Sequence, residues 1–393
     1  MDIFEKCYEY HLADQIKAAG YYPYFHALES RQDKEVVMEG KRRIMLGSNN
    51  YLGLTTNPEV IEAGIHAFEQ YGSGCSGSRF LNGTLRMHLE LEQELAEFLG
   101  KDGIVTFSTG FQTNLGIISA IVGHGDFAIC DAENHASIYD GCKLSYGRML
   151  TYAHSNMEEL EIQLKKVPES AGCLIVTDGV FSMGGDLCKL PEIVKLAKQY
   201  GARVMVDDAH GLGVVGEGGR GTASHFGLEK EVDLIMGTFS KSLASLGGYL
   251  VADATVVDFV RHNSRPFIFS ASIPPASAAI ALASLKYIEA HPEIVKRLGD
   301  LSAYMRRGLK ARGIPIIEAE TPIIPIYTYT PEATLLRARQ LYEAGVYVNP
   351  VLPPATPPEL CLLRTSYMAS LNEKLLDEAL DIFGEVFSKP AEA

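Results

Sequence analysis

The sequence predicts an α/β protein, with a mainly parallel sheet in a large domain and a smaller α+β domain at the C-terminal end. The chain has 393 residues, 47% of them hydrophobic, which exceeds the usual size of one domain and gives enough apolar material for two cores. Short apolar runs alternate with helical stretches through its middle, the pattern of a layered α/β domain. Several of these runs are apolar throughout, as expected for strands covered on both faces.

Changes in sequence character place the domain boundaries near residues 43 and 270. Residues 1–42 are mixed in charge and rich in tyrosine, with no strand-like run before Arg43, so we expect a helical arm with an irregular lead-in. Such an arm packs on a partner subunit or is an ordinary surface helix. The large domain is predicted over 43–269. The small domain, 270–393, opens with a small-residue helix after Pro275 and has predicted strands near 323–328, 346–349 and 360–364.

The large domain begins with a short apolar strand, Arg43–Leu46, followed by a turn-rich segment, Gly47–Leu54. Pro58–Tyr71 is predicted as a helix, because proline suits a first helical turn and the apolar residues recur at helical spacing. The glycine-rich stretch Tyr71–Thr84 can approach a ligand closely with its backbone, although a flexible surface linker is the simpler alternative. A helix follows and is expected to end at Gly100.

Six strands are predicted from the remaining apolar runs of the large domain. They are Ile104–Phe107, Phe127–Cys130, Cys173–Thr177, Arg203–Val206, Leu234–Met236 and Gly248–Val251. Helices such as Pro191–Tyr200 separate some of them. In a parallel sheet ligands bind beyond the carboxyl ends of the strands, so the residues that follow each strand are the candidates for function.

Polar residues follow five of these strands in succession. The segments are Ser108–Asn114, Asp131–Ser137, Asp178–Asp186, Asp207–Gly211 and, around one lysine, Met236–Ser242. Ser108–Asn114 is a small, hydroxyl-rich turn that opens a helix, which offers free backbone amides to an anion. The sequence therefore predicts one polar site at the carboxyl edge of the sheet.

The chemistry of this site centres on Lys241. A lysine amine attacks carbonyls when burial or a neighbouring cation lowers its pKa, so Lys241 is a candidate Schiff-base lysine. Asp207 could keep a pyridinium nitrogen protonated, His210 could reach the phenolic oxygen of the same ring, and His135 could lie flat against it. These residue types together indicate pyridoxal phosphate as the cofactor.

Two anion-binding elements suit the single phosphate of that cofactor: Gly110 and Phe111 at the helix start, and Thr238 and Ser240 beside the lysine. Each signal alone is weak. The lysine motif by itself fits a surface lysine in a polar turn equally well, and a lone strand-end histidine is more often a structural hydrogen-bonding residue. Their joint order along one alternating α/β pattern favours the cofactor site.

Composition excludes several other classes of protein. A formal net charge of −14 argues against a nucleic-acid surface, which needs clustered lysine and arginine. Seven cysteines without a Cys-x-x-Cys pair indicate reduced thiols in a cytoplasmic protein, and we expect no metal site. The charged N-terminus lacks the apolar core of a signal peptide, and no window is long and apolar enough for a transmembrane helix, so we expect a soluble protein.

Five motifs make the resemblance to a known family specific. Gly47–Leu54, Asn134–Ser137, Asp178–Asp186, Val206–Gly211 and Gly237–Lys241 resemble the α-oxoamine synthase family, fold-type I pyridoxal-phosphate enzymes that condense an amino acid with an acyl-CoA. The resemblance runs from about residue 43 to residue 370. Within the family, Arg265–Pro275 and Val346–Pro357 are most similar to bacterial serine palmitoyltransferases, the soluble homodimeric kind.

The resemblance implies a role for each matching residue of the cofactor site. Lys241 would be the imine lysine and proton shuttle, Asp207 the pyridinium partner, His210 the contact to the phenolic oxygen and His135 the ring-stacking residue. The residues that would hold the phosphate are Gly110, Phe111, Thr238 and Ser240, with Ser272 contributed by the other subunit of a dimer with a shared active site.

The resemblance also implies a substrate site. Arg364 matches the arginine that grips the amino-acid carboxylate, a role that suits its planar fork, and Asn49 matches the asparagine beside it. Asp178 and Asp208 depart from the family pattern, which usually has glutamate at both positions. Both changes keep the charge and shorten its reach, and we assign neither a catalytic role.

The implied reaction is the decarboxylative condensation of L-serine with a long-chain acyl-CoA to 3-ketodihydrosphingosine, the first step of sphingolipid synthesis. The proline-rich segment Pro353–Pro357 favours serine and a long chain by likeness alone. The alternatives are a glycine- or alanine-using relative, such as glycine C-acetyltransferase or 8-amino-7-oxononanoate synthase, a non-catalytic binding protein of the same fold, and an aminotransferase. Acyl length, the acyl carrier and contact with a membrane surface stay open.

Overall fold

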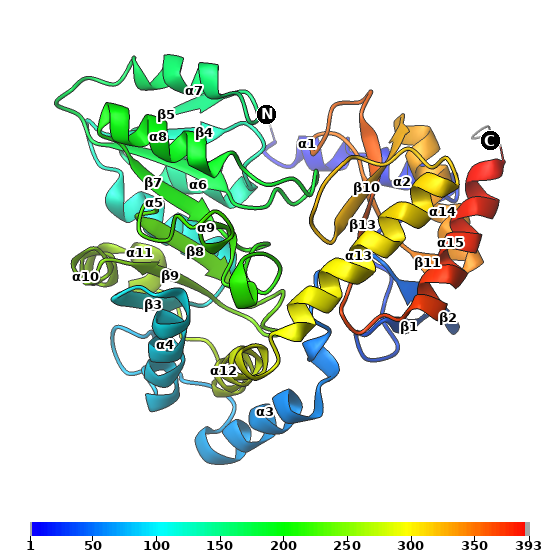
Figure 1. Cartoon of the computed structure of the whole chain (residues 1–393), viewed down its shortest axis with the longest axis horizontal. Coiled ribbons are helices and arrows are strands. Elements are labelled where there is room, and N and C mark those ends of the chain that lie inside the picture. The colour runs from blue at the N-terminus through cyan, green and yellow to red at the C-terminus, as the bar shows by residue number, and fades with distance from the viewer. Residues whose placement is uncertain (1, 390–393) are drawn as a thin grey trace. The chain divides into compact units, whose positions relative to one another are not determined.

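The computed structural model describes residues 2–389, so Met1 and the last four residues of the predicted small domain lie outside the described part. The chain divides into two compact units. The terminal unit comprises Met1–Ser48, Leu301–Glu318 and Ile323–Ala393, and the sheet unit comprises Asn49–Asp300 and Ala319–Pro322. The predicted boundary at 269/270 thus falls inside the sheet unit, and the predicted arm, 1–42, belongs to the terminal unit (Figure 1).

A seven-stranded sheet forms the centre of the sheet unit. Its order is β3 (Gly103–Phe107), β9 (Gly248–Ala252), β8 (Leu234–Thr238), β7 (Arg203–Asp207), β6 (Cys173–Asp178), β4 (Phe127–Asp131) and β5 (Arg148–Tyr152). Figure 1 shows it running from β3 in the lower part of the view to β4 and β5 in the upper part. Only β9 runs in the direction opposite to the other six strands, which confirms the predicted mainly parallel sheet.

Helices pack on this sheet as the alternating pattern predicts. α5 (Gly110–Ile121) contacts β3, β8 and β9, and it shares a buried apolar core with α10 (Ala254–Asn263) and α11 (Arg265–Ile268). α7 (Met157–Leu164) contacts β4 and β5, and α8 (Leu190–Tyr200) contacts β7. α6 (Ala136–Leu144) packs against α5. The central strands are buried along almost their whole length, which explains their apolar sequences.

The helices α3 (Pro58–Tyr71), α4 (Arg86–Leu99) and α12 (Pro275–Ala290) complete the sheet unit, with the short elements η1 (Leu54–Thr56), η2 (Glu217–Gly219) and α9 (Thr222–His225). Asn57 caps α3 by accepting from the backbone N–H groups of the first turn, and Gly100 ends α4 in the left-handed conformation. α12 packs against α3 and α4, which is why the sequence beyond residue 270 still belongs to this unit (Figure 1).

The terminal unit is the predicted α+β region. One sheet has the order β1 (Glu35–Met38), β2 (Lys41–Met45) and β11 (Val346–Tyr347). The other, antiparallel throughout, has the order β10 (Ile323–Tyr329), β13 (Cys361–Ser366) and β12 (Asn349–Val351). Its helices are α1 (Glu5–Tyr8), α2 (Leu12–Ala18), α13 (Glu293–Ala311, which begins in the sheet unit), α14 (Pro331–Ala344) and α15 (Glu373–Ser388).

Two strands differ from the sequence prediction. The expectation of no strand before Arg43 is wrong, because β1 pairs with β2 through a tight turn in which Glu39 and Gly40 both have positive φ. β5 was not predicted either. It lies at the sheet edge with most of its residues exposed, so its sequence lacks the continuous apolar run of a central strand.

The described helices include none that combines the length and apolarity needed to cross a membrane. All seven cysteines lie in the described part of the chain and carry free thiols.

Candidate active site

A cavity of about 340 Å³ opens at the carboxyl edge of the parallel strands. It brings together eight of the predicted cofactor-site residues: Gly110, Phe111, His135, Asp207, His210, Thr238, Ser240 and Lys241. The other lining residues are Thr109, Asn114, Ser137, Asp178, Ala209, Met236 and Leu246. Residues more than a hundred positions apart in the sequence therefore line one open cavity.

Lys241 lies in a tight turn directly after β8. Phe239 is fully buried and stacks on the ring of Tyr249, with ring centroids 6.0 Å apart. The chain then reverses, since the Ala244 N–H donates to the Lys241 carbonyl over 3.0 Å and the Ser245 N–H to the Phe239 carbonyl over 2.9 Å. The buried aromatic ring thus anchors the turn that places the half-buried lysine in the cavity wall.

Asp207 is the last residue of β7, and its carboxylate is buried and held at both oxygens. The side-chain amide of Asn114 donates to Oδ2 over 2.7 Å, and the Ala209 N–H donates to Oδ1 over 3.0 Å. Asn114 Nδ2 also donates to the Ser137 hydroxyl over 2.8 Å. Neutral donors thus fix the orientation of a carboxylate in the cavity wall. Asn114 Oδ1 is buried and has no hydrogen-bond partner among the described residues.

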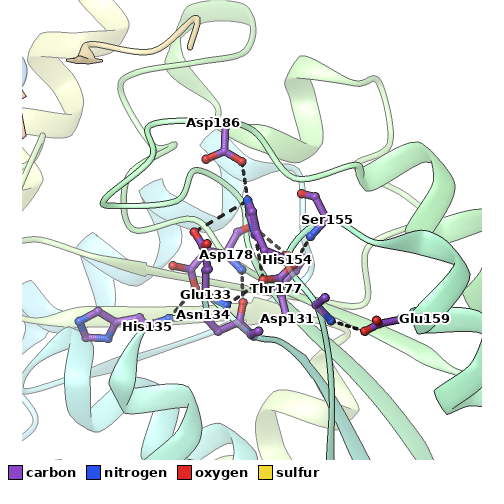
Figure 2. Close-up of polar contacts among 12 residues, drawn as sticks. Asp131, Glu133, Asn134, His135, His154, Ser155, Glu159, Thr177, Asp178 and Asp186 are labelled. Carbon is purple, nitrogen blue, oxygen red and sulfur yellow. Dashed lines mark hydrogen bonds and ion pairs between the residues drawn. The ribbon is translucent and has the colours of Figure 1, made fainter. Parts of the chain in front are cut away.

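His135 caps the N-terminus of α6. Its Nδ1 lies 2.7 Å from the Ser137 hydroxyl. Its backbone N–H donates to Asp178 Oδ1 over 3.2 Å (Figure 2). Burial lowers the pKa of His135 against the opposing attraction of Asp207, and the positive charge of Lys241 lowers it further. The imidazole is therefore neutral at neutral pH, as suits a ring that stacks against a ligand.

His210 is linked to the segment that follows β2. The Tyr51 hydroxyl lies 2.6 Å from His210 Nδ1 and 3.4 Å from Asn49 Oδ1. Asn49 is not among the cavity-lining residues, but Tyr51 connects it to one that is.

The N-terminus of α5 has the features of a phosphate site. The Thr109 hydroxyl accepts from the Gln112 N–H, and the Thr109 carbonyl accepts from the Thr113 N–H, each over 3.1 Å. The two earlier N–H groups, of Gly110 and Phe111, have no partner within the helix and are available to an anion. The hydroxyls of Thr238 and Ser240, 2.9 Å apart, line the same cavity.

Glycine is required at position 110 by close packing. A Cβ there would lie 2.7 Å from Thr238 Oγ1, closer than side chains approach one another. The absence of a side chain therefore lets the helix start pack against the end of β8, which joins the two anion-binding elements.

Asp178 and Asp208, which we assigned no catalytic role, are both buried. Asp178 lines the cavity, and burial together with the charge of Asp207 raises its pKa well above the ordinary range. Asp208 accepts from the N–H and hydroxyl of Thr222 over 2.9 and 2.5 Å, and burial raises its pKa to about 6. The Asp178 side chain thus supports His135, whereas Asp208 secures the start of α9.

Besides Asn49, two predicted site residues do not line this cavity. Ser272 follows α11, its N–H donates to the Gly77 carbonyl over 2.9 Å, and its hydroxyl is buried without a hydrogen-bond partner in residues 2–389. Arg364 lies in β13 of the terminal unit, where it is buried and its Nη1 is 3.5 Å from the Ser366 hydroxyl. Their roles in binding phosphate and substrate stay predictions.

Sequence reasoning missed Asn114, Ser137 and Tyr51. Asn114 stands one helical turn after Gly110, so its position on the site-facing side of α5 could have been inferred from helical periodicity. Ser137 and Tyr51 carry no comparable signal, because only the packed structure shows which neighbour each hydroxyl meets. Residues 2–389 contain no cluster of three or more histidine, cysteine, aspartate or glutamate side chains suited to a metal ion.

The family profile described as "Aminotransferase class I and II" matches residues 41–383, most of the chain. The chain belongs to this family. Relatives that match almost the whole chain show the family independently.

Relatives across the whole length narrow the comparison. The chain is 48% identical to a serine palmitoyltransferase of Sphingobacterium spiritivorum, over 98% of this chain and 96% of that protein. It is 40% identical to an 8-amino-7-oxononanoate synthase of Thermoanaerobacter pseudethanolicus, over 95% of each chain. A solved structure of a serine palmitoyltransferase with a pyridoxal-phosphate internal aldimine superimposes with a TM-score of 0.95 at 38% identity, covering 99% of both chains. The predicted fold is thereby confirmed.

Proposed function

We propose that this protein is a pyridoxal-phosphate-dependent acyltransferase that condenses L-serine with a long-chain acyl-CoA such as palmitoyl-CoA. The acyl carbon joins the serine Cα, coenzyme A leaves as the thiol, the serine carboxylate leaves as carbon dioxide, and 3-ketodihydrosphingosine is the product. The observation that carries the proposal is the convergence of Lys241, Asp207 and His135 in one cavity, in a chain 48% identical to a serine palmitoyltransferase.

The cavity fits pyridoxal phosphate. When bound, that cofactor supplies an aldehyde that captures amines and a pyridinium ring that withdraws electrons. The helix-start amides of Gly110 and Phe111 and the hydroxyls of Thr238 and Ser240 would hold the phosphate. Asp207, oriented by Asn114, would keep the proton on the ring nitrogen. The buried, unpartnered Oδ1 of Asn114 is a further polar atom at the site.

The histidines of the cavity would orient the ring. His135, kept neutral by burial, would lie against one ring face and exclude water from it. His210, held by the Tyr51 hydroxyl, would donate to the phenolic oxygen. Lys241 Nζ would form the covalent bond to the cofactor. It would then take the proton from the serine Cα and return a proton to the product carbon.

Arg364 and Asn49 are the proposed serine-binding residues. A guanidinium binds a carboxylate through two parallel hydrogen bonds, which fixes the orientation of the bond that must break. Arg364 is buried and so already restricted in its side-chain rotamers, which reduces the entropy lost on binding.

We further propose a homodimer in the cytoplasm, with Ser272 of one subunit at the phosphate site of the other and with peripheral contact to a membrane where its lipid substrate is held. Ser272 lies outside the cavity lining of its own chain, as expected of a residue that serves the site of the partner subunit. A Ser272→Ala variant that binds the cofactor as tightly as the wild type would contradict it.

Absorbance titration of the pyridoxal-phosphate-loaded protein with serine, glycine and alanine tests the proposal. We expect serine to change the cofactor spectrum at the lowest concentration, and palmitoyl-CoA then to release free coenzyme A thiol. Preference for alanine with a pimeloyl thioester would instead make the protein an 8-amino-7-oxononanoate synthase, the alternative that the 40% identity supports. Keto-acid production without a thioester would indicate an aminotransferase. A cofactor spectrum that does not change with any of the three amino acids would indicate a non-catalytic binding protein.

A further inference from the structure

His154 lies between two carboxylates just after the end of β5. Its Nδ1 is 3.0 Å from Asp131 Oδ1 and its Nε2 is 3.0 Å from Asp186 Oδ2 (Figure 2). A histidine can donate from both nitrogens only when it is protonated. The geometry is therefore that of an imidazolium that joins two aspartates from different segments of the chain.

The first aspartate begins the loop that carries His135. Asp131 is the buried last residue of β4, and besides His154 its carboxylate accepts from the N–H groups of Glu133 and Ser155, each over 2.9 Å. Asn134 then ties the loop to β6, donating to the Val176 carbonyl over 2.8 Å. Holding Asp131 therefore fixes the backbone that leads into His135.

The second aspartate closes a hairpin, residues 180–187, that directly follows Asp178. Val180 and Leu187 form an antiparallel bridge, and the Phe181 N–H donates to the Asp186 carbonyl over 2.9 Å. The Phe181 ring also packs edge-on against His154, with ring centroids 4.4 Å apart. This hairpin is thus attached to His154 through both a charge and an aromatic contact.

These contacts form a closed circuit that includes two residues of the cavity wall, His135 and Asp178. It runs from His154 through Asp131 to His135, from the His135 N–H to the Asp178 carboxylate, and along the hairpin to Asp186 and back to His154 (Figure 2). His154 itself is not among the cavity-lining residues, so it acts on the site only through the segments it joins.

The charges around His154 favour its protonated form. The groups that face it are Asp131 at the end of β4, Asp186 at the end of the hairpin and, 3.9 Å from Nε2, the Glu133 carboxylate. Burial lowers the pKa of His154, but hydrogen bonds to the two aspartates and their charges outweigh burial and raise it to about 10.

We propose that His154 is a positioning residue, a cationic clamp that holds the His135 loop to the 180–187 hairpin and so sets where the His135 ring stands at the cofactor. The proposal rests on the proposed function, since it assigns His135 to the cofactor ring. Because a neutral imidazole presents a lone pair to one of the two carboxylates, the clamp opens when His154 loses its proton. Its effect is fully present near pH 7 and is lost as pH rises through the folded pKa.

The test compares pyridoxal-phosphate affinity of the cofactor-free wild type with that of His154→Asn, measured by absorbance titration at several pH values. Losing a hydrogen bond to a charged group changes an equilibrium constant on the order of 10-fold, so we expect the dissociation constant of the variant to rise on the order of 10-fold at pH 7.5. The difference in dissociation constant between the two proteins should become smaller by pH 10.5, because His154 of the wild type has then lost its proton too. His262→Asn is the matched control, since His262 is exposed and lies 3.5 Å from Asp258 on α10.

A second variant, Asp186→Asn, removes one charge but keeps His154 and the buried Asp131. It tests the clamp if His154→Asn does not melt cooperatively and so does not fold. We expect its affinity for pyridoxal phosphate to be about threefold weaker than that of the wild type at pH 7.5, and this difference to become smaller at high pH. Variant affinities equal to that of the wild type would overturn the proposal. So would a ratio of variant to wild-type dissociation constants that stays constant from pH 7.5 to pH 10.5. A wild type that binds no pyridoxal phosphate would instead refute the proposed function.

Discussion

Replacing Asn114 with alanine isolates the hydrogen bond that orients Asp207. Asn114 is fully buried and donates to the Asp207 carboxylate over 2.7 Å, while its own Oδ1 has no partner among the described residues. A hydrogen bond to a charged group contributes about 1.5–3 kcal/mol, and each ~1.4 kcal/mol changes an equilibrium constant tenfold. Because this bond helps to orient Asp207, we expect the dissociation constant of pyridoxal phosphate to rise by about 10- to 100-fold.

Absorbance titration of the cofactor-free Asn114→Ala protein measures this loss directly. The matched control is Asn263→Ala at the end of α10, where the side-chain amide donates to the Phe259 carbonyl on an exposed surface. The control should bind the cofactor as the wild type does. Unchanged affinity in Asn114→Ala, with its melting temperature within a few degrees of the wild-type value, would show that the hydrogen bond from Asn114 does not matter to Asp207 and would refute the prediction.

Three further predictions concern the covalent bond, the substrate carboxylate and the phosphate site. After borohydride reduction, the wild type should gain the mass of one cofactor per chain, and Lys241→Ala should gain none. Cofactor mass on the Lys241→Ala chain would show that another residue forms the covalent bond. Arg364→Ala should bind serine about 10- to 100-fold more weakly in absorbance titrations while retaining the cofactor, because two charge-assisted hydrogen bonds are lost; unchanged serine affinity would exclude Arg364. Gly110→Ala should weaken cofactor binding about tenfold, since its Cβ would lie 2.7 Å from Thr238 Oγ1 and overpacking costs about 1–3 kcal/mol. Gly299→Ala, with nothing near the added Cβ, is its control, and equal affinities in these two variants would contradict the crowding argument.

The sheet could be predicted from sequence where burial is complete. β4 and β8 are buried along their whole length, so their apolar runs stand out between polar segments. β5 and β1 escaped prediction because only part of each strand is buried, so neither has a continuous apolar run. The fully buried strands thus reveal the fold class, whereas the partly exposed strands give no clear apolar pattern.

The division of the chain into units depends on contacts that sequence character does not reveal. The small-residue helix α12 marks a change of composition, yet it packs against α3 and α4 of the sheet unit. The short segment Ala319–Pro322 also belongs to this unit, where the Thr321 hydroxyl donates to the Gly185 carbonyl over 2.6 Å. Both assignments require knowledge of tertiary packing.

The sequence predicts those residues of the candidate site that directly follow an apolar strand. Asp207, Lys241 and His135 each follow a recognisable apolar strand, and the parallel sheet brings those ends to one edge. The supporting residues Asn114, Tyr51 and His154 could not be assigned in this way, because their function lies in a hydrogen bond to a residue far along the chain. Sequence therefore indicates the residues that line the cavity more readily than those that hold them in place.

Product analysis with labelled serine tests the central claim most directly. The wild-type protein, loaded with pyridoxal phosphate, is incubated with palmitoyl-CoA and serine labelled either at the carboxyl carbon or at the side-chain carbon, and the lipid product is analysed by mass spectrometry. We predict 3-ketodihydrosphingosine that retains the side-chain label and has lost the carboxyl label as carbon dioxide. A product that keeps the carboxyl label, or a protein that condenses glycine or alanine but not serine, would contradict the account.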